Sequence, residues 1–154
     1  MRLALLALCF LASCGGGGGG PQTQEECPTN LSVLVNVVAT LPDGVGSCDR
    51  CVGDGFTYVK ILDGLPQETR RRVIAHELGH AAGLAHLWDG TDCVMDQNIL
   101  ATMGPLCPSE VSAMNVAMGS RILDLFPGPN LFDDVVAAAD MWSIAVGRPL
   151  FAVH

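Results

Sequence analysis

Residues 76–86 have the sequence His-Glu-Leu-Gly-His-Ala-Ala-Gly-Leu-Ala-His, and they contain three of the four histidines in this 154-residue chain. On an α-helix, His76 and His80 lie one turn apart on the same face, so both rings can bind one metal ion. Gly83 suits the end of that helix, because glycine adopts positive φ at little cost. A reversal of the chain after Gly83 would bring His86 back as a third ligand.

The composition of this candidate site favours catalysis. Three neutral imidazoles at about 2.0–2.1 Å from a zinc ion leave one tetrahedral position for water, an arrangement typical of catalytic rather than structural zinc. Glu77 would lie beside the ion without binding it, where its carboxylate can accept a proton from water. The sequence therefore predicts one catalytic Zn²⁺ held by His76, His80 and His86, with Glu77 as general base.

The pattern H-E-x-x-H-x-x-G-x-x-H resembles the signature of the metzincin zinc metallopeptidases. The five specified positions are matched here by His76, Glu77, His80, Gly83 and His86. The resemblance implies a zincin-like domain and a metalloendopeptidase, a hydrolase whose partners are peptide or protein substrates.

A methionine downstream of the histidines extends this resemblance. In the metzincins a methionine in a turn, the Met-turn, forms an apolar floor beneath the zinc without binding it. Met95 follows His86 at a distance similar to that in the matrixins, a metzincin family, and the spacing from Met95 to the next expected helix at Ser109 is also similar. We therefore favour Met95 for this role, with Met103 as its rival.

The N-terminal residues have the features of a bacterial lipoprotein signal. Arg2 precedes a short apolar run, and Leu11-Ala12-Ser13-Cys14 resembles the lipobox, whose cysteine is acylated. The glycines from 15 to 20 would form a flexible tether. We expect a signal peptide over residues 1–13, a lipidated Cys14 with its tether over 14–26, and a metzincin-like catalytic domain with a C-terminal helical extension over 27–154.

These features predict a location in the bacterial cell envelope. A lipid anchor on Cys14 would attach the protein to a membrane and leave the domain facing the periplasm or the exterior. An ordinary signal peptide, which would leave a secreted protein, is the alternative. The sequence contains no indication of an oligomeric state.

The charge of the chain argues against a nucleic-acid partner. It has 16 acidic and 8 basic residues, and removal of residues 1–13 would change the formal charge from −8 to −9. Binding to nucleic acid depends on Lys and Arg that neutralise phosphates. The one basic cluster, Arg70 to Arg72, is expected to be an exposed first part of the long helix rather than a ligand site.

Five cysteines, Cys27, Cys48, Cys51, Cys93 and Cys107, remain for an oxidising compartment once Cys9 and Cys14 are assigned to the N-terminal signal. We favour a disulfide between Cys93 and Cys107, because it would tie the segment below the metal to the next helix. Cys27 can pair with either Cys48 or Cys51, which leaves one thiol over.

The remaining pattern predicts an α+β domain in which a short mixed sheet packs on the long active-site helix. Period-two alternation indicates strands, and apolar positions three or four apart indicate helices. Ile74, Leu78, Ala81 and Ala85 form the row expected to pack on the sheet. We expect strands at 31–38 and 56–62, a loop at 41–55, helices at 66–82, 109–118 and 131–146, and a break at 126–130.

Only two strands are expected before the active-site helix, fewer than a metzincin has. The edge strand that pairs with a peptide substrate would then be missing, even with an intact zinc site. The alternative function is therefore a membrane-tethered binding lipoprotein in which zinc stabilises a small fold and no peptide is cleaved.

Overall fold

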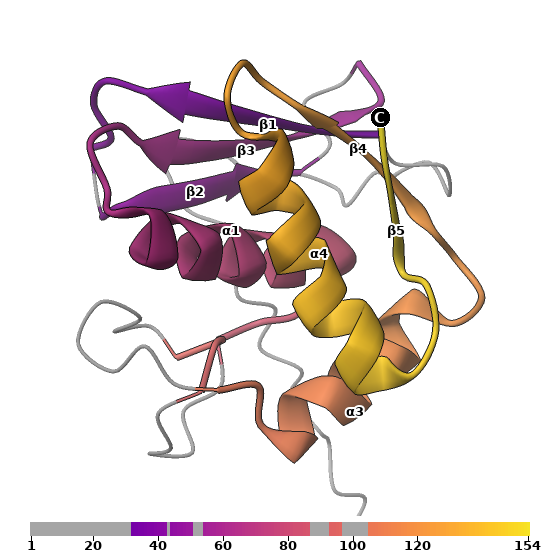
Figure 1. Ribbon diagram of the computed structural model, residues 1–154. Helices are drawn as coiled ribbons and strands as arrows, with labels where there is room; N and C mark the ends of the chain where they lie inside the picture. Colours follow the sequence, from indigo (N-terminus) through magenta and orange to yellow (C-terminus); the bar gives the residue numbers. More distant parts are fainter. Residues whose placement is uncertain (1–31, 43, 51–53, 87–92, 97–104) are drawn as a thin grey trace, which may run out of the picture.

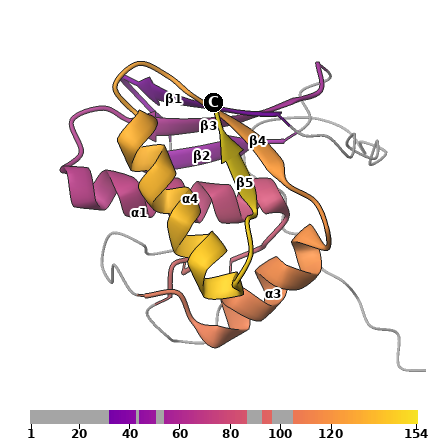
Figure 2. The same ribbon diagram turned by 45° about the vertical axis from the view of Figure 1, so that its right-hand side comes forward.

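The computed structural model describes residues 32–42, 44–50, 54–86, 93–96 and 105–154. In these residues, five strands form one mixed sheet, and helices α1 and α4 lie on one side of it with α3 beyond them (Figures 1 and 2). The chain passes in order through β1 (Ser32–Val38), β2 (Gly46–Asp49), β3 (Phe56–Leu62), α1 (Gln67–Ala82), α3 (Pro108–Met118), β4 (Leu123–Pro127), α4 (Phe132–Val146) and β5 (Phe151–Val153).

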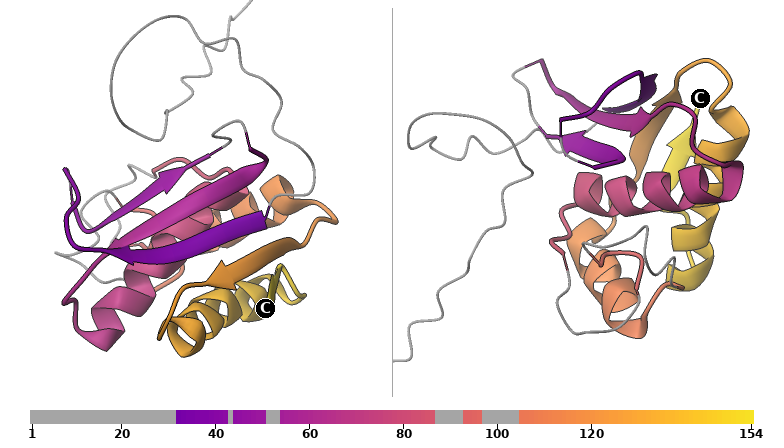
Figure 3. Two further views of the ribbon diagram at one scale, coloured as in Figure 1. Left: turned by 90° about the horizontal axis from the view of Figure 1, so that it is seen from above. Right: turned by 90° about the vertical axis from the view of Figure 1, so that its left-hand side faces the viewer.

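The strand order in the sheet is β2-β3-β1-β4-β5. β2 is antiparallel to β3, whereas the β3–β1, β1–β4 and β4–β5 pairs are parallel. Helix α4 makes the crossover between the parallel neighbours β4 and β5. Figure 3 shows the sheet from above and from the side, with β2 along one edge near α1.

The alternation seen in the sequence orients the predicted strands correctly. Val33 and Val35 of β1 and Val59 and Ile61 of β3 are fully buried and face the helices. The predicted bounds of the second strand, 56–62, agree with β3, and β1 covers residues 32–38 of its predicted range. The two strands pair in parallel with Val33 opposite Thr57, so their buried faces coincide.

The sequence missed three strands. β2 lies within the expected loop at 41–55, because Gly, Ser and Asp have low strand propensity and only the pairing with β3 holds them extended. β4 overlaps the expected break at 126–130, because Pro127, which is typical of a break, is the last residue of a strand in which Leu123 and Leu125 alternate as buried residues. β5 has only three residues.

The long helix begins after Pro66 and ends before Gly83, close to the expected bounds. Ile74, Leu78 and Ala81 are buried as expected. Ala85 is exposed, so its place in that row was wrong: the helix ends three residues earlier and the row does not extend to it. The two later helices also lie close to their expected ranges.

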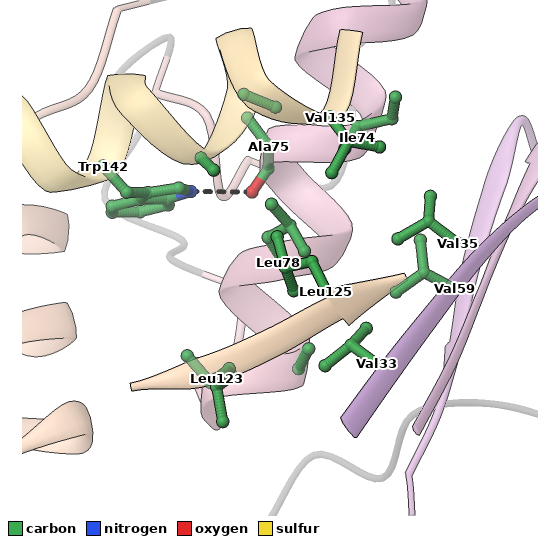
Figure 4. Close-up of a cluster of buried hydrophobic side chains, with 14 of the residues drawn as sticks. Val33, Val35, Val59, Ile74, Ala75, Leu78, Leu123, Leu125, Val135 and Trp142 are labelled. Carbon is green, nitrogen blue, oxygen red and sulfur yellow. Dashed lines mark hydrogen bonds between the residues drawn. The ribbon is translucent and has the colours of Figure 1, made fainter. Parts of the chain in front are cut away.

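The expected C-terminal helical extension is an integral part of the domain. Figure 4 shows Val135 and Trp142 of α4 in the same buried cluster as Ile74 and Leu78 of α1. The indole Nε1 of Trp142 donates to the carbonyl of Ala75 at 2.8 Å. Helix α4 therefore packs directly on the helix that carries the histidines.

The basic cluster at the start of α1 binds an acidic side chain. The carboxylate of Asp134, which is only 2% exposed, accepts hydrogen bonds from Arg70 at 2.6 Å, from Arg71 at 2.8 Å and from Gln67 at 3.2 Å. Burial alone would raise the pKa of Asp134, but these hydrogen bonds outweigh it and lower the pKa. The expectation of a merely exposed basic face was therefore wrong for Arg70 and Arg71, because they join α1 to α4.

Several predictions fall on residues that the structure does not describe. The signal peptide, Cys14, the tether and Cys27 lie in residues 1–31, while Cys51 and Met103 lie in 51–53 and 97–104. Among the helices of the described residues, none is long and apolar enough to span a bilayer. The disulfide between Cys93 and Cys107 is present, with the two Cα atoms 5.6 Å apart.

Candidate metal centre

The three predicted ligands converge on one point. The Nε2 atom of His80 lies 3.1 Å from that of His76 and 3.1 Å from that of His86, and the remaining Nε2 pair is 3.2 Å apart. Three nitrogen ligands of a tetrahedral ion with bonds of 2.0–2.1 Å would be separated by about 3.3 Å. The side chains of His76, His80 and His86 are thus arranged as a group that can hold a metal ion.

The other ring nitrogens fix the tautomers of two of these histidines. Nδ1 of His76 donates to the carbonyl of Val94 at 2.6 Å, and Nδ1 of His80 donates to the carbonyl of Leu84 at 2.8 Å. A carbonyl can only accept, so in the neutral rings each Nε2 presents a lone pair to the common centre. These lone pairs repel one another, and a cation between them would turn that repulsion into attraction.

Burial keeps the histidines neutral. It is the main reason that the pKa of His76 is lowered from 6.5 to about 4, although the hydrogen bond to Val94 raises it. Burial also lowers the pKa of His80 and of His86. Neutral imidazole is the form that binds a metal ion, so the three rings are ready for binding at neutral pH.

The end of α1 brings the third histidine into place as the sequence predicted. Gly83 has φ of 108°, in the left-handed region, and its N–H donates to the carbonyl of His80 at 2.9 Å. The N–H of Leu84 donates to the carbonyl of Gly79, also at 2.9 Å. This pair of bonds forms a Schellman motif, which ends the helix and turns the chain so that His86 meets the other two rings.

Glu77 is buried on α1 next to the first residue of β2. A Cβ atom on Gly46 would lie 2.5 Å from Oε1 of Glu77 and 2.7 Å from Cγ1 of Val73. Strand β2 can therefore approach this carboxylate so closely only because residue 46 has no side chain. No sequence pattern indicates this contact, since Gly46 falls within the loop expected at 41–55.

Met95 packs beneath the metal-binding turn of α1. It is fully buried, and a Cβ atom on Gly79 would lie only 2.3 Å from its sulfur. Gly79 lies between His76 and His80 in the sequence, so the thioether fills the space under the helix between the two ligands. The role expected for Met95, an apolar floor beneath a bound zinc ion, stays a prediction, and its rival Met103 lies outside the described residues.

Glu110 holds the turn that contains Met95. Its fully buried carboxylate accepts hydrogen bonds from the backbone N–H of Met95 and from that of Cys107, the latter at 2.9 Å. The disulfide between Cys93 and Cys107 joins the same two segments. Two links therefore fix the turn whose Val94 carbonyl orients His76.

Sequence reasoning missed Glu110 as a functional residue. The available indication was its place three residues after Cys107, where a glutamate commonly caps the start of a helix. The bond from Cys107 to Glu110 is of this kind. The hydrogen bond from the N–H of Met95 connects helix α3 to the candidate metal centre. No local sequence pattern predicts this bond.

Comparison with known proteins adds no relative: no family model matches the chain, and no curated protein or solved structure matches it significantly.

Proposed function

We propose that the protein is a zinc-dependent metalloendopeptidase. The observation that carries this proposal is the triangle of three Nε2 atoms, 3.1–3.2 Å apart. Two of them belong to His76 and His80 on α1, and the buried Glu77 directly follows His76 on the same helix. A structural zinc site normally has four protein ligands, whereas the described residues provide a group of three histidines here. A free fourth position and a neighbouring carboxylate are what hydrolysis requires.

The residues divide the work of the proposed reaction. His76, His80 and His86 would hold the ion, and a bound zinc ion supplies Lewis acidity that lowers the pKa of water and polarises a carbonyl. Glu77 would accept the proton of the attacking water and return it to the leaving amine. Val94 and Leu84 orient two of the ligand rings through their carbonyls, and Met95 supports the helix from below.

The edge strand β2 supports a peptide as substrate. β2 pairs with β3 on one side, and no strand of the described residues pairs with its other edge. An extended peptide can add to such an edge through backbone hydrogen bonds. Because Gly46 of β2 contacts Glu77, a peptide bound there would pass close to the proposed general base. In this proposal, β2 would be the substrate-binding edge that the sequence did not reveal.

The test compares Glu77→Gln with wild-type protein for zinc content and for cleavage of a peptide library. We expect the variant to bind one zinc per chain and to lose peptide cleavage by at least about 100-fold, because general base catalysis contributes about 10²–10⁴-fold. Glu68→Gln, at a position where the side chain is 66% exposed on the same helix, is the matched control. Zinc binding without any cleavage by wild-type protein would instead favour the binding lipoprotein.

We further propose that a lipid on Cys14 anchors the protein in the bacterial cell envelope. This rests on the Leu-Ala-Ser-Cys sequence at residues 11–14. Cys14→Ser should move the protein from the membrane fraction to the soluble fraction. An unchanged membrane fraction for that variant would rule out acylation as the cause of attachment.

A further inference from the structure

Arg50 lies beside the metal centre, directly after the last residue of β2. A Cβ atom on Gly83, where α1 ends, would lie 3.7 Å from Nη1 and 3.9 Å from Nη2 of Arg50. The positive charge of Arg50 also acts on His80. Burial is the largest cause that lowers the pKa of the His80 ring, and the charge of Arg50 is a smaller one. The guanidinium is thus close to His80, one of the three proposed ligands, and Arg50 itself is exposed.

The other basic side chains of the described residues have partners. Lys60 pairs with Asp49, Arg72 pairs with Glu68, and Arg70 and Arg71 share Asp134. Arg121 and Arg148 donate to backbone carbonyls. In the part of the chain that the structure describes, Arg50 has neither an ion pair nor a hydrogen bond, although the chain carries a net charge of −8.

An unpaired guanidinium next to a site for a divalent cation is electrostatically unfavourable in the absence of an anion. An anionic group bound between the two would interact favourably with both. The guanidinium is also the side chain whose planar set of donors best matches a carboxylate. The charge arrangement therefore favours a ligand that brings a carboxylate to the metal centre.

The course of β2 shows how a peptide would reach Arg50. Gly46 at the start of β2 contacts Val73 and Glu77, while Arg50 just past its end lies beside Gly83. β2 therefore runs along α1, past Glu77 and towards the end of the helix. At about 3.3 Å per residue, an extended peptide on this edge spans the distance from Gly46 to Arg50 in about four residues.

We propose that Arg50 binds a carboxylate of the substrate, so that the enzyme prefers peptides with Asp or Glu within about four residues of the scissile bond. This proposal rests on the proposed function. If the peptide pairs antiparallel to β2, its N-terminal part lies next to Arg50, and the acidic residue precedes the scissile bond. A parallel peptide would instead place residues after the scissile bond there, including a C-terminal carboxylate.

The first experiment measures the cleavage of paired peptides that differ only by Glu or Gln at successive positions, each with a free or an amidated C-terminus. Wild-type protein should cleave the best Glu peptide about tenfold more efficiently than its Gln partner, mainly through KM. Arg50→Gln should abolish this difference without changing cleavage of the Gln peptide, and Arg50→Lys should restore part of it. Arg148→Gln, which removes the same charge at a guanidinium bonded to the carbonyl of Gly119, should behave like wild type.

The second experiment measures binding without turnover. Zinc-loaded Glu77→Gln should bind the fluorescently labelled Glu peptide about tenfold more tightly than the Gln peptide, and the double variant with Arg50→Gln should bind both equally. Loss of the preference on amidation would identify the terminal carboxylate as the group recognised. Efficient cleavage with no preference for acidic peptides would overturn this inference and leave the proposed function intact. Absence of all cleavage would overturn both.

Discussion

The substitution Glu110→Gln tests how the proposed metal centre is supported by the residues around it, because it leaves the three histidines themselves unchanged. The glutamate is fully buried, and its two oxygens accept hydrogen bonds from the N–H groups of Met95 and Cys107. Glutamine has the same shape, but its amide NH₂ must face one of these donors. One buried N–H then loses its acceptor, and the other bond loses its charge.

The expected cost follows from these two losses. An unsatisfied buried donor costs about 1–3 kcal/mol, and the change from a charged to a neutral acceptor costs about 1 kcal/mol more. We therefore expect the free energy of unfolding to fall by about 2–4 kcal/mol. Because the turn at Met95 also places the Val94 carbonyl that orients His76, zinc affinity should fall about 10-fold or more.

The assay combines urea unfolding of the metal-free protein with zinc competition against a chromophoric chelator. The absorption spectrum of the Co²⁺-substituted protein gives a third measurement, because it reports on the ligand geometry and a purely global loss of stability would leave it unchanged. Glu68→Gln serves as control for a charge loss on the surface. If Glu110→Gln keeps the zinc affinity and the Co²⁺ spectrum of the wild-type protein, the proposed link between α3 and the metal centre is refuted.

Two further predictions concern acid and the close contact at Gly46. The pKa of His76 is lowered from 6.5 to about 4 in the folded protein, so below pH 6.5 the unfolded chain binds a proton that the folded chain does not. The metal-free protein should therefore lose about 2 kcal/mol of stability between pH 7 and pH 5, measured by urea unfolding, and His76→Gln should remove much of this dependence. Gly46→Ala should reduce kcat while zinc content stays at one per chain, because its Cβ atom would lie 2.5 Å from Oε1 of Glu77 and displace that carboxylate. Unchanged kcat in Gly46→Ala would show that Glu77 can move without consequence.

The cluster of three histidines was predictable because it depends on local rules. His76 and His80 share a helix face through their spacing alone, and Gly83 ends the helix in the left-handed conformation that glycine favours. The disulfide between Cys93 and Cys107, which was expected because it ties the segment below the metal site to the next helix, is confirmed. The histidine spacing lies within residues 76–86, whereas the two cysteines are 14 residues apart in the sequence.

The parts that escaped prediction depend on contacts between distant segments. β2 is extended because β3 pairs with it, not because Gly46 to Asp49 favour a strand. Asp134 shows why Arg70 and Arg71 are not simply solvated: its partners lie more than 60 residues earlier in the chain. Glu110 accepts a hydrogen bond from the backbone N–H of Met95. Because the donor is a backbone group, the type of residue at position 95 gives no indication of this contact.

The position of β1 at the centre of the sheet determines when the domain can mature. β1 pairs with β3, which precedes the metal-binding helix, and with β4, which follows it. A chain that is still emerging from the ribosome or from a translocation channel cannot complete the sheet before residues 123–127 are available, and the packing of Trp142 on Ala75 comes later still. Formation of the proposed catalytic centre is therefore coupled to delivery of the chain through residue 142, and shorter chains would lack the proposed activity.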